Sequence, residues 1–159
     1  MYQYEFEQIG HSSDVVVLYC SVETLLSRER YKKDFQVLLL KRAHEPCKHL
    51  WCIPGGHTEA YETLADGAIR EAKEEAGLVL DNVVFVANYD SLLRAGKRRV
   101  IASCFVTVFT QKPEVTIDNN EISGYKWVDL AQVGKHKLAF DHNQMVKDSY
   151  AAICKTVQT

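Results

Sequence analysis

One segment, Pro54–Leu78 (PGGHTEAYETLADGAIREAKEEAGL), constrains the fold more than any other part of the chain. Thr63 followed three residues later by Asp66 has the form of a capping box, and Gly77 stands where a left-handed helix end is expected. These signals predict a helix at about 64–76. At about 100° per residue, its small apolar side chains fall on one arc about 100° wide, as in a helix packed closely on a sheet. They are Ala65, Ala68, Ile69, Ala72 and Ala76.

The adjoining arc of this helix carries a cluster of carboxylates. Glu71 lies at helical neighbour spacing from both Glu74 and Glu75, and each like-charge pair costs roughly 0.2–0.5 kcal/mol. Gly67 inside the helix costs about another 1 kcal/mol relative to Ala. Such violations are expected at functional sites, and clustered carboxylates suit a hard divalent cation. From the residues alone, two interpretations remain: a solvated helix surface, or a metal and phosphate site.

Length, charge and cysteine content limit the class of protein. At 159 residues, we expect a single domain over 1–159. A net charge of -2 gives no electrostatic basis for nonspecific nucleic-acid binding. Without a basic region ahead of an apolar core, or a run of about 18 apolar residues, we expect a soluble, cytoplasmic protein with no membrane partner. Five cysteines favour reduced thiols. A zinc cluster at His44, Cys47, His49 and Cys52 is the less favoured interpretation of their spacing.

Apolar runs rich in β-branched and aromatic residues predict five strands. They are Asp14–Cys20, Phe35–Arg42, Asn82–Leu93, Arg99–Thr110 and a shorter one at Gly124–Leu130. Helical spacing of apolar residues predicts a second helix from about His142 to Val157. This order of elements predicts an α/β fold in which helices pack on a mixed β-sheet.

The acidic segment resembles the Nudix box of the Nudix hydrolases, G-x5-E-x7-R-E-U-x-E-E-x-G-U, in which U is aliphatic. The matching positions are Gly56, Glu62, Arg70, Glu71, Glu74, Glu75 and Gly77, followed by Leu78 at the last aliphatic position. Ala72 replaces the inner aliphatic residue. With each residue type at roughly 5–7% of average composition, seven matches arise by chance on the order of once in 10⁸ start points. The resemblance implies an α/β/α sandwich with a mixed sheet and a catalytic helix at about 64–76.

The resemblance extends over most of the chain after Asp14. Residues 38–64 resemble the strand and loop that precede the box in the family, and residues 119–130 resemble its acidic loop and tryptophan strand. LAFDHNQMV, residues 138–146, is similar to the start of the last helix in the subgroup that includes ADP-ribose pyrophosphatases. Members with this ending often have Asp-Pro-Arg where this chain has SLLRAGKRR, residues 91–99. The substrate is therefore left open.

The resemblance also implies roles for the box residues. Glu71, Glu74 and Glu75 match the metal-ligand carboxylates of the family, and the backbone carbonyl of Gly55 matches another ligand. Mg²⁺ is the expected ion, with Mn²⁺ as an alternative. Two further residues are expected to support catalysis: Arg70 pairs with a box carboxylate and holds the loop against the helix, and Glu62 orients that loop.

The general base and the phosphate contacts lie outside these assignments. The base is either a box glutamate or Glu121, for which an ordinary turn carboxylate is the alternative. Arg94 and Arg99 lie in a cationic stretch expected to bind substrate phosphate, unless it is a solvated hairpin tip.

The implied reaction is attack of water on a nucleoside diphosphate linked to another group, for which ADP-ribose or a related nucleotide derivative is the expected small-molecule partner. The alternatives are a nucleoside triphosphate pyrophosphohydrolase of the sanitation type and a non-catalytic nucleotide-sensing module. The oligomeric state stays open, with a homodimer as one option.

Overall fold

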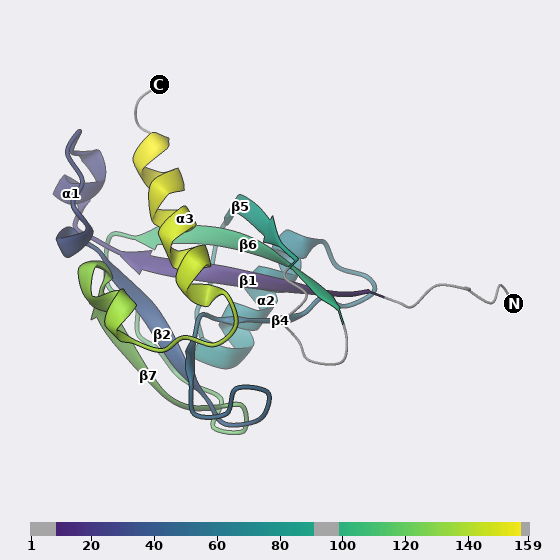
Figure 1. The fold of residues 1–159 in the computed structure, drawn as a ribbon. Helices are drawn as coiled ribbons and strands as arrows, with labels where there is room; N and C mark the ends of the chain where they lie inside the picture. Colours follow the sequence, from purple (N-terminus) through teal and green to yellow (C-terminus); the bar gives the residue numbers. More distant parts are fainter. Residues whose placement is uncertain (1–8, 91–98, 157–159) are drawn as a thin grey trace, which may run out of the picture.

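A mixed sheet forms the centre of the fold in the computed structural model, which describes residues 9–90 and 99–156 (Figure 1). Within these residues the strands are β1 (Gly10–Tyr19), β2 (Gln36–Arg42), β3 (Trp51–Cys52), β4 (Gly55–His57), β5 (Val84–Tyr89), β6 (Val100–Phe109) and β7 (Ile122–Asp129). The main path runs β3-β2-β1-β6-β5, while β4 pairs with β1 and β7 pairs with β2. β1 and β6 are parallel, and the other pairings between these seven strands are antiparallel.

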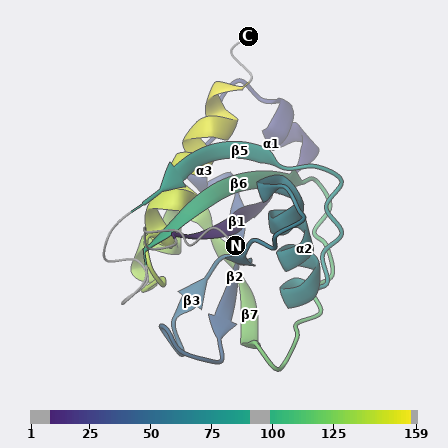
Figure 2. The same cartoon turned by 90° about the vertical axis from the view of Figure 1, so that its right-hand side faces the viewer.

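Helices cover both faces of this sheet (Figure 2). The described helices are α1 (Val22–Leu26), α2 (Leu64–Ala76) and α3 (His142–Lys155), with 3-10 turns η1 (Lys32–Asp34) and η2 (Leu130–Lys135). Because side chains alternate along β1, Val15 and Val17 join the core under α2, whereas Val16 and Leu18 join the core under α3. The expected α/β/α sandwich with a mixed sheet is therefore confirmed. None of the described helices is long and apolar enough to cross a membrane.

The start and end of α2 follow from the local signals in its sequence. Thr63 Oγ1 accepts a hydrogen bond from the Asp66 N–H over 3.1 Å, and the Asp66 side chain accepts from the Thr63 N–H. Gly77 ends the helix in the left-handed region with φ 67°. A Cβ at Gly67 would lie 2.9 Å from Glu62 Oε1, so the helix-weakening glycine makes room for Glu62. The helix predicted at 64–76 is confirmed.

The longer strands are confirmed in position, but several of their ends differ. β1 begins at Gly10 rather than Asp14, because the polar residues 10–13 pair with β6 and partly with β4. β5 covers only Val84–Tyr89 of the predicted Asn82–Leu93, whose last three residues lie outside the described part. β3, β4 and α1 contain two, three and five residues and were not predicted. Elements this short have no resolvable periodicity.

Candidate active site

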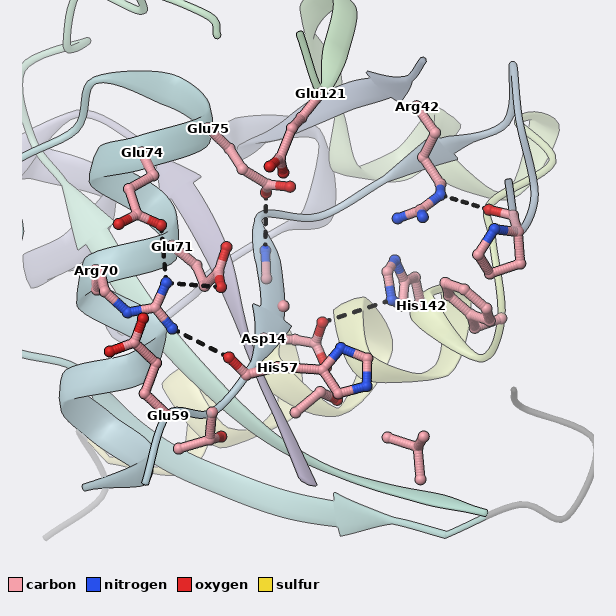
Figure 3. A pocket seen from close by; sticks show the side chains of 17 residues that line it. Asp14, Arg42, His57, Glu59, Arg70, Glu71, Glu74, Glu75, Glu121 and His142 are labelled. Carbon is pink, nitrogen blue, oxygen red and sulfur yellow. Dashed lines mark hydrogen bonds and ion pairs between the residues drawn. The ribbon is translucent and has the colours of Figure 1, made fainter. Parts of the chain in front are cut away.

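The carboxylates of α2 face a cavity of about 600 Å³ (Figure 3). Glu71, Glu74 and Glu75 line it from α2, and Glu121 lines it from the loop before β7. The carboxylates of Glu75 and Glu121 lie close together in Figure 3, and the negative charge of Glu121 is one of the causes that raise the pKa of Glu75. The structure thus brings together the four glutamates that the sequence singled out as metal ligands or base.

Arg70 ties the loop before α2 to the helix itself. Its Nε and Nη2 donate to the two carboxylate oxygens of Glu62, over 2.9 and 2.8 Å, and Nη2 also donates to the His57 carbonyl over 3.1 Å. This bidentate contact is the largest cause of the lowered pKa of Glu62, which is about 2. The hydrogen bond from the Glu59 N–H is the second cause. These contacts place Arg70 and Glu62 between the loop and the helix, and their supporting role in catalysis stays a prediction.

Two carboxylates of the cluster are buried against the glycine-containing strand β4. Glu71 is 8% exposed and Glu75 is 5% exposed. Burial raises the pKa of Glu71, and it raises the pKa of Glu75 to about 8 despite a 3.0 Å hydrogen bond from the Gly55 N–H. Nearby acidic groups, including Glu121, raise both values further. A cation among these oxygens would favour the ionised form of both carboxylates and so oppose both pKa shifts.

The two glycines of β4 leave space for the carboxylates of Glu71 and Asp14. A Cβ at Gly56 would lie 2.4 Å from Glu71 Oε1, and a Cβ at Gly55 would lie 2.2 Å from Asp14 Oδ1. Neither approach is possible with a side chain. The backbone of this strand therefore lies directly beside the carboxylate cluster, where the Gly55 carbonyl was expected to act as a ligand.

The chemistry of these donors fits a hard divalent cation, since every expected ligand atom is an oxygen. In the described residues, however, no three His, Cys, Asp or Glu side chains converge as a ready-made metal cage. Arg70 accounts for part of this, because it forms ion pairs with Glu71 and Glu74 at 2.9 and 2.8 Å. His44, Cys47, His49 and Cys52, the residues of the zinc alternative, form no such group either.

The cavity also contains residues that sequence reasoning did not assign to the site. Asp14 on β1, Arg42 at the end of β2 and His142 at the start of α3 all line it. In Figure 3, Arg42 and His142 lie across the cavity from Arg70. Arg42 Nε donates to the Pro46 carbonyl over 2.7 Å, and its guanidinium lies 5.5 Å from the centre of the Phe140 ring. Arg42 thus places a positive charge opposite the acidic helix. The signal that the sequence offers for this residue is its position, since Arg42 is a cationic residue at the end of a largely apolar strand.

The structure describes one of the two predicted phosphate-binding arginines, Arg99. Arg94 lies outside the described residues. Arg99 forms an ion pair with Asp90 over 3.0 Å, and Val100 rather than Arg99 lines the cavity. A substrate contact by either arginine stays a prediction.

Comparison with known proteins identifies the family. The NUDIX domain model matches residues 21–149, and the chain therefore belongs to the family of Nudix hydrolases. An ADP-ribose pyrophosphatase of Methanocaldococcus jannaschii is 33% identical over 118 residues, which cover 74% of this chain and 67% of that protein.

Solved structures agree with the fold. The NUDIX domain of Shewanella oneidensis NrtR, complexed with ADP ribose, gives a TM-score of 0.78 at 22% identity and covers 93% of this chain and 90% of that one. A bifunctional NMN adenylyltransferase/ADP ribose pyrophosphatase of Francisella tularensis, complexed with AMP and an Mn ion, gives a TM-score of 0.71 at 22% identity. That match covers 94% of this chain and 43% of the other. The expected family and fold are confirmed.

Proposed function

We propose that this Nudix hydrolase cleaves the pyrophosphate bond of a nucleoside diphosphate linked to another group, with ADP-ribose as the leading substrate. One observation carries the proposal: Glu71 is buried beside the backbone of Gly56 and Glu75 beside that of Gly55, in a cavity that also contains Arg42. A cavity of about 600 Å³ lies within the range that encloses small-molecule ligands. The similarity to the ADP-ribose pyrophosphatase of Methanocaldococcus jannaschii supports the choice of substrate.

We further propose that Mg²⁺, or Mn²⁺ in its place, is held by Glu71, Glu74, Glu75 and the Gly55 carbonyl. When bound, such an ion stabilises charge on phosphate oxygens and lowers the pKa of a bound water. The raised pKa of the buried Glu75 supports this assignment, because a carboxylate without a compensating cation is costly at that depth. The Mn ion in the Francisella tularensis complex makes manganese a reasonable second ion to test.

The residues of the chain divide the remaining tasks. Arg42 contacts a substrate phosphate from the side of the cavity opposite α2, since a guanidinium matches phosphate oxygens in charge and geometry. Arg70 keeps the loop around Glu62 closed on the helix. Glu121 accepts a proton from the attacking water, because its carboxylate lies at the cavity and is less buried than Glu71 or Glu75. We also propose that residues 1–159 form one domain, since both described cores share a single sheet.

A comparison of products tests the function. The protein is incubated with Mg²⁺ and, in parallel, with ADP-ribose, nucleotide sugars, dinucleotides and nucleoside triphosphates. The expected result is release of AMP and ribose 5-phosphate from ADP-ribose. Release of inorganic pyrophosphate from triphosphates, without cleavage of ADP-ribose, would replace the proposal by the sanitation activity. Folded protein that cleaves none of these compounds with Mg²⁺ or Mn²⁺ would reject it.

A further inference from the structure

The floor of the cavity holds a buried pair of side chains that lie outside the Nudix box. Asp14 on β1 is 4% exposed and His142 at the start of α3 is 2% exposed, although both line the cavity. His142 Nε2 lies 3.8 Å from Asp14 Oδ1, which is an ion-pair distance rather than a hydrogen bond (Figure 3). Ionisable groups are costly to bury, so a pair at this depth indicates a specific role.

The second ring nitrogen of His142 connects the buried pair to the backbone segment that begins at Ile53. The backbone N–H of Ile53 donates a hydrogen bond to His142 Nδ1 over 3.2 Å. A ring nitrogen that accepts a hydrogen bond carries no proton, so the proton of the neutral ring is on Nε2, toward Asp14. The carboxylate of Asp14 favours this tautomer and thereby keeps Nδ1 available to Ile53.

Ile53 leads into the segment that carries the Gly55 carbonyl. The next residue, Pro54, accepts a hydrogen bond from the Val15 N–H over 2.9 Å, and the Gly55 N–H donates to Glu75 over 3.0 Å. Asp14 also touches this segment directly, because its Oδ1 would lie 2.2 Å from a Cβ at Gly55. The segment is therefore held from α2 through Glu75, and from β1 and α3 through the buried pair.

We propose that His142, together with Asp14, is a positioning residue for ion binding: its Nδ1 fixes the Ile53 backbone and, through it, the Gly55 carbonyl beside Glu75. The inference rests on the proposed function in one respect, namely that Gly55 and Glu75 bind a divalent cation. Outer partners that orient metal ligands typically change metal affinity or activity by about 10–100-fold when they are lost.

Two substitutions that introduce the same amide group distinguish a positioning role of His142 from a role in packing alone. His142→Asn places its amide oxygen close to the position of Nδ1, whereas His142→Gln extends the amide toward the position of Nε2. Mn²⁺ binding to the full chain is measured without substrate, by the electron paramagnetic resonance signal of free Mn²⁺, and thermal midpoints are recorded without metal. His142→Gln should weaken Mn²⁺ binding about tenfold or more. His142→Asn should bind within about threefold of wild type, because Ile53 keeps its acceptor.

Several outcomes would overturn the inference. Equal Mn²⁺ affinity in His142→Gln and wild type would do so, and so would equal losses in the two variants, which would indicate packing alone. If His142→Gln does not fold, Asp14→Asn takes its place, since a neutral amide no longer favours the Nε2 tautomer. Weaker Mn²⁺ binding in Asp14→Asn supports the inference, and unchanged binding rejects it.

The wild-type protein separates this inference from the proposed function. Wild type that binds no Mn²⁺ rejects the positioning role, because there is then no bound ion to position. Wild type that binds Mn²⁺ but cleaves no nucleotide derivative rejects the proposed function, while the comparison of His142→Gln with His142→Asn still decides the inference.

Discussion

Arg70 binds Glu71 and Glu74 through a single nitrogen: its Nη1 lies 2.9 Å from Glu71 Oε1 and 2.8 Å from Glu74 Oε2. The like-charge repulsion expected between Glu71 and Glu74 is thus relieved by a residue of the same helix. Glu75 is not part of this ion pairing and instead accepts from the Gly55 N–H. The three glutamates of α2 are therefore not equivalent, and substitutions at Glu75 and Glu74 should affect stability differently.

Glu75→Gln should lower turnover by at least about 100-fold while the protein stays folded, because it removes a negative ligand and keeps the side-chain volume. Without metal at pH 8 or above, its thermal midpoint should equal or exceed that of wild type, since burial of a charge is relieved. Turnover is measured at saturating Mg²⁺. Near wild-type turnover would remove Glu75 from the ligand set.

Glu74→Gln should reduce turnover by a similar factor, but its effect on stability should be small and of the opposite sign. The side chain of Glu74 is 57% exposed, so its ion pair with Arg70 contributes about 1 kcal/mol or less. Glu114→Gln, an exposed position outside the cavity lining, is the matched control and should leave turnover and thermal midpoint unchanged. A loss of turnover in Glu114→Gln would show that the loss in Glu74→Gln does not depend on the position of Glu74 in the cavity.

The metal-free protein should become less stable as the pH rises from about 5 to 8. Glu75 has a pKa of about 8 in the folded state against 4.5 as the reference value, so in this interval the folded state binds more protons than the unfolded state. Its stabilising contribution is complete below about 4.5 and is lost as the pH rises through about 8, up to about 5 kcal/mol as an upper bound. Glu71, whose pKa is also raised, acts in the same direction.

Denaturant unfolding at several pH values measures this slope. Glu75→Gln should flatten it, and saturating Mg²⁺ should flatten or reverse it, because the ion binds the ionised form. Glu62 does not interfere, since its lowered pKa of about 2 places its titration below this interval. A slope that is the same in wild type and Glu75→Gln would contradict the assignment of the pKa shift to Glu75.

The sequence predicted α2 to the residue because the signals are local: Thr63 and Asp66 cap one end and Gly77 ends the other. The box glutamates were predicted for the same reason, since their spacing on one helix defines one surface. Asp14 and His142 could not be assigned to the site in this way. They meet because β1 and the start of α3 approach the same loop, and such contacts across 128 positions of chain leave no periodic signal.

Arg42→Ala should raise KM with a smaller effect on kcat, if the phosphate contact is equally strong in the ground and transition states. Charge-assisted hydrogen bonds of this kind contribute roughly 1.5–3 kcal/mol, which corresponds to a KM about 10–150 times higher. Arg99→Ala is the comparison, because the Arg99 guanidinium pairs with Asp90 and a smaller change is expected. A raised KM in Arg99→Ala alone would assign the phosphate contact to Arg99, directly before β6, as the sequence predicts.

Glu121→Gln divides two mechanisms that the geometry permits. If Glu121 is the general base, Glu121→Gln should lower kcat by about 10²–10⁴-fold. The acidic limb of the pH–rate profile should be lost, and the Mg²⁺ concentration for half-maximal activity should change little. The Ala43 N–H donates to the Glu121 backbone carbonyl over 2.9 Å, so the loop should keep its position in the variant. Activity restored by high Mg²⁺ would make Glu121 an auxiliary ligand instead. Turnover within about threefold of wild type at every Mg²⁺ concentration would reject Glu121 as the base and favour a glutamate of α2, where Glu71, Glu74 and Glu75 line the cavity.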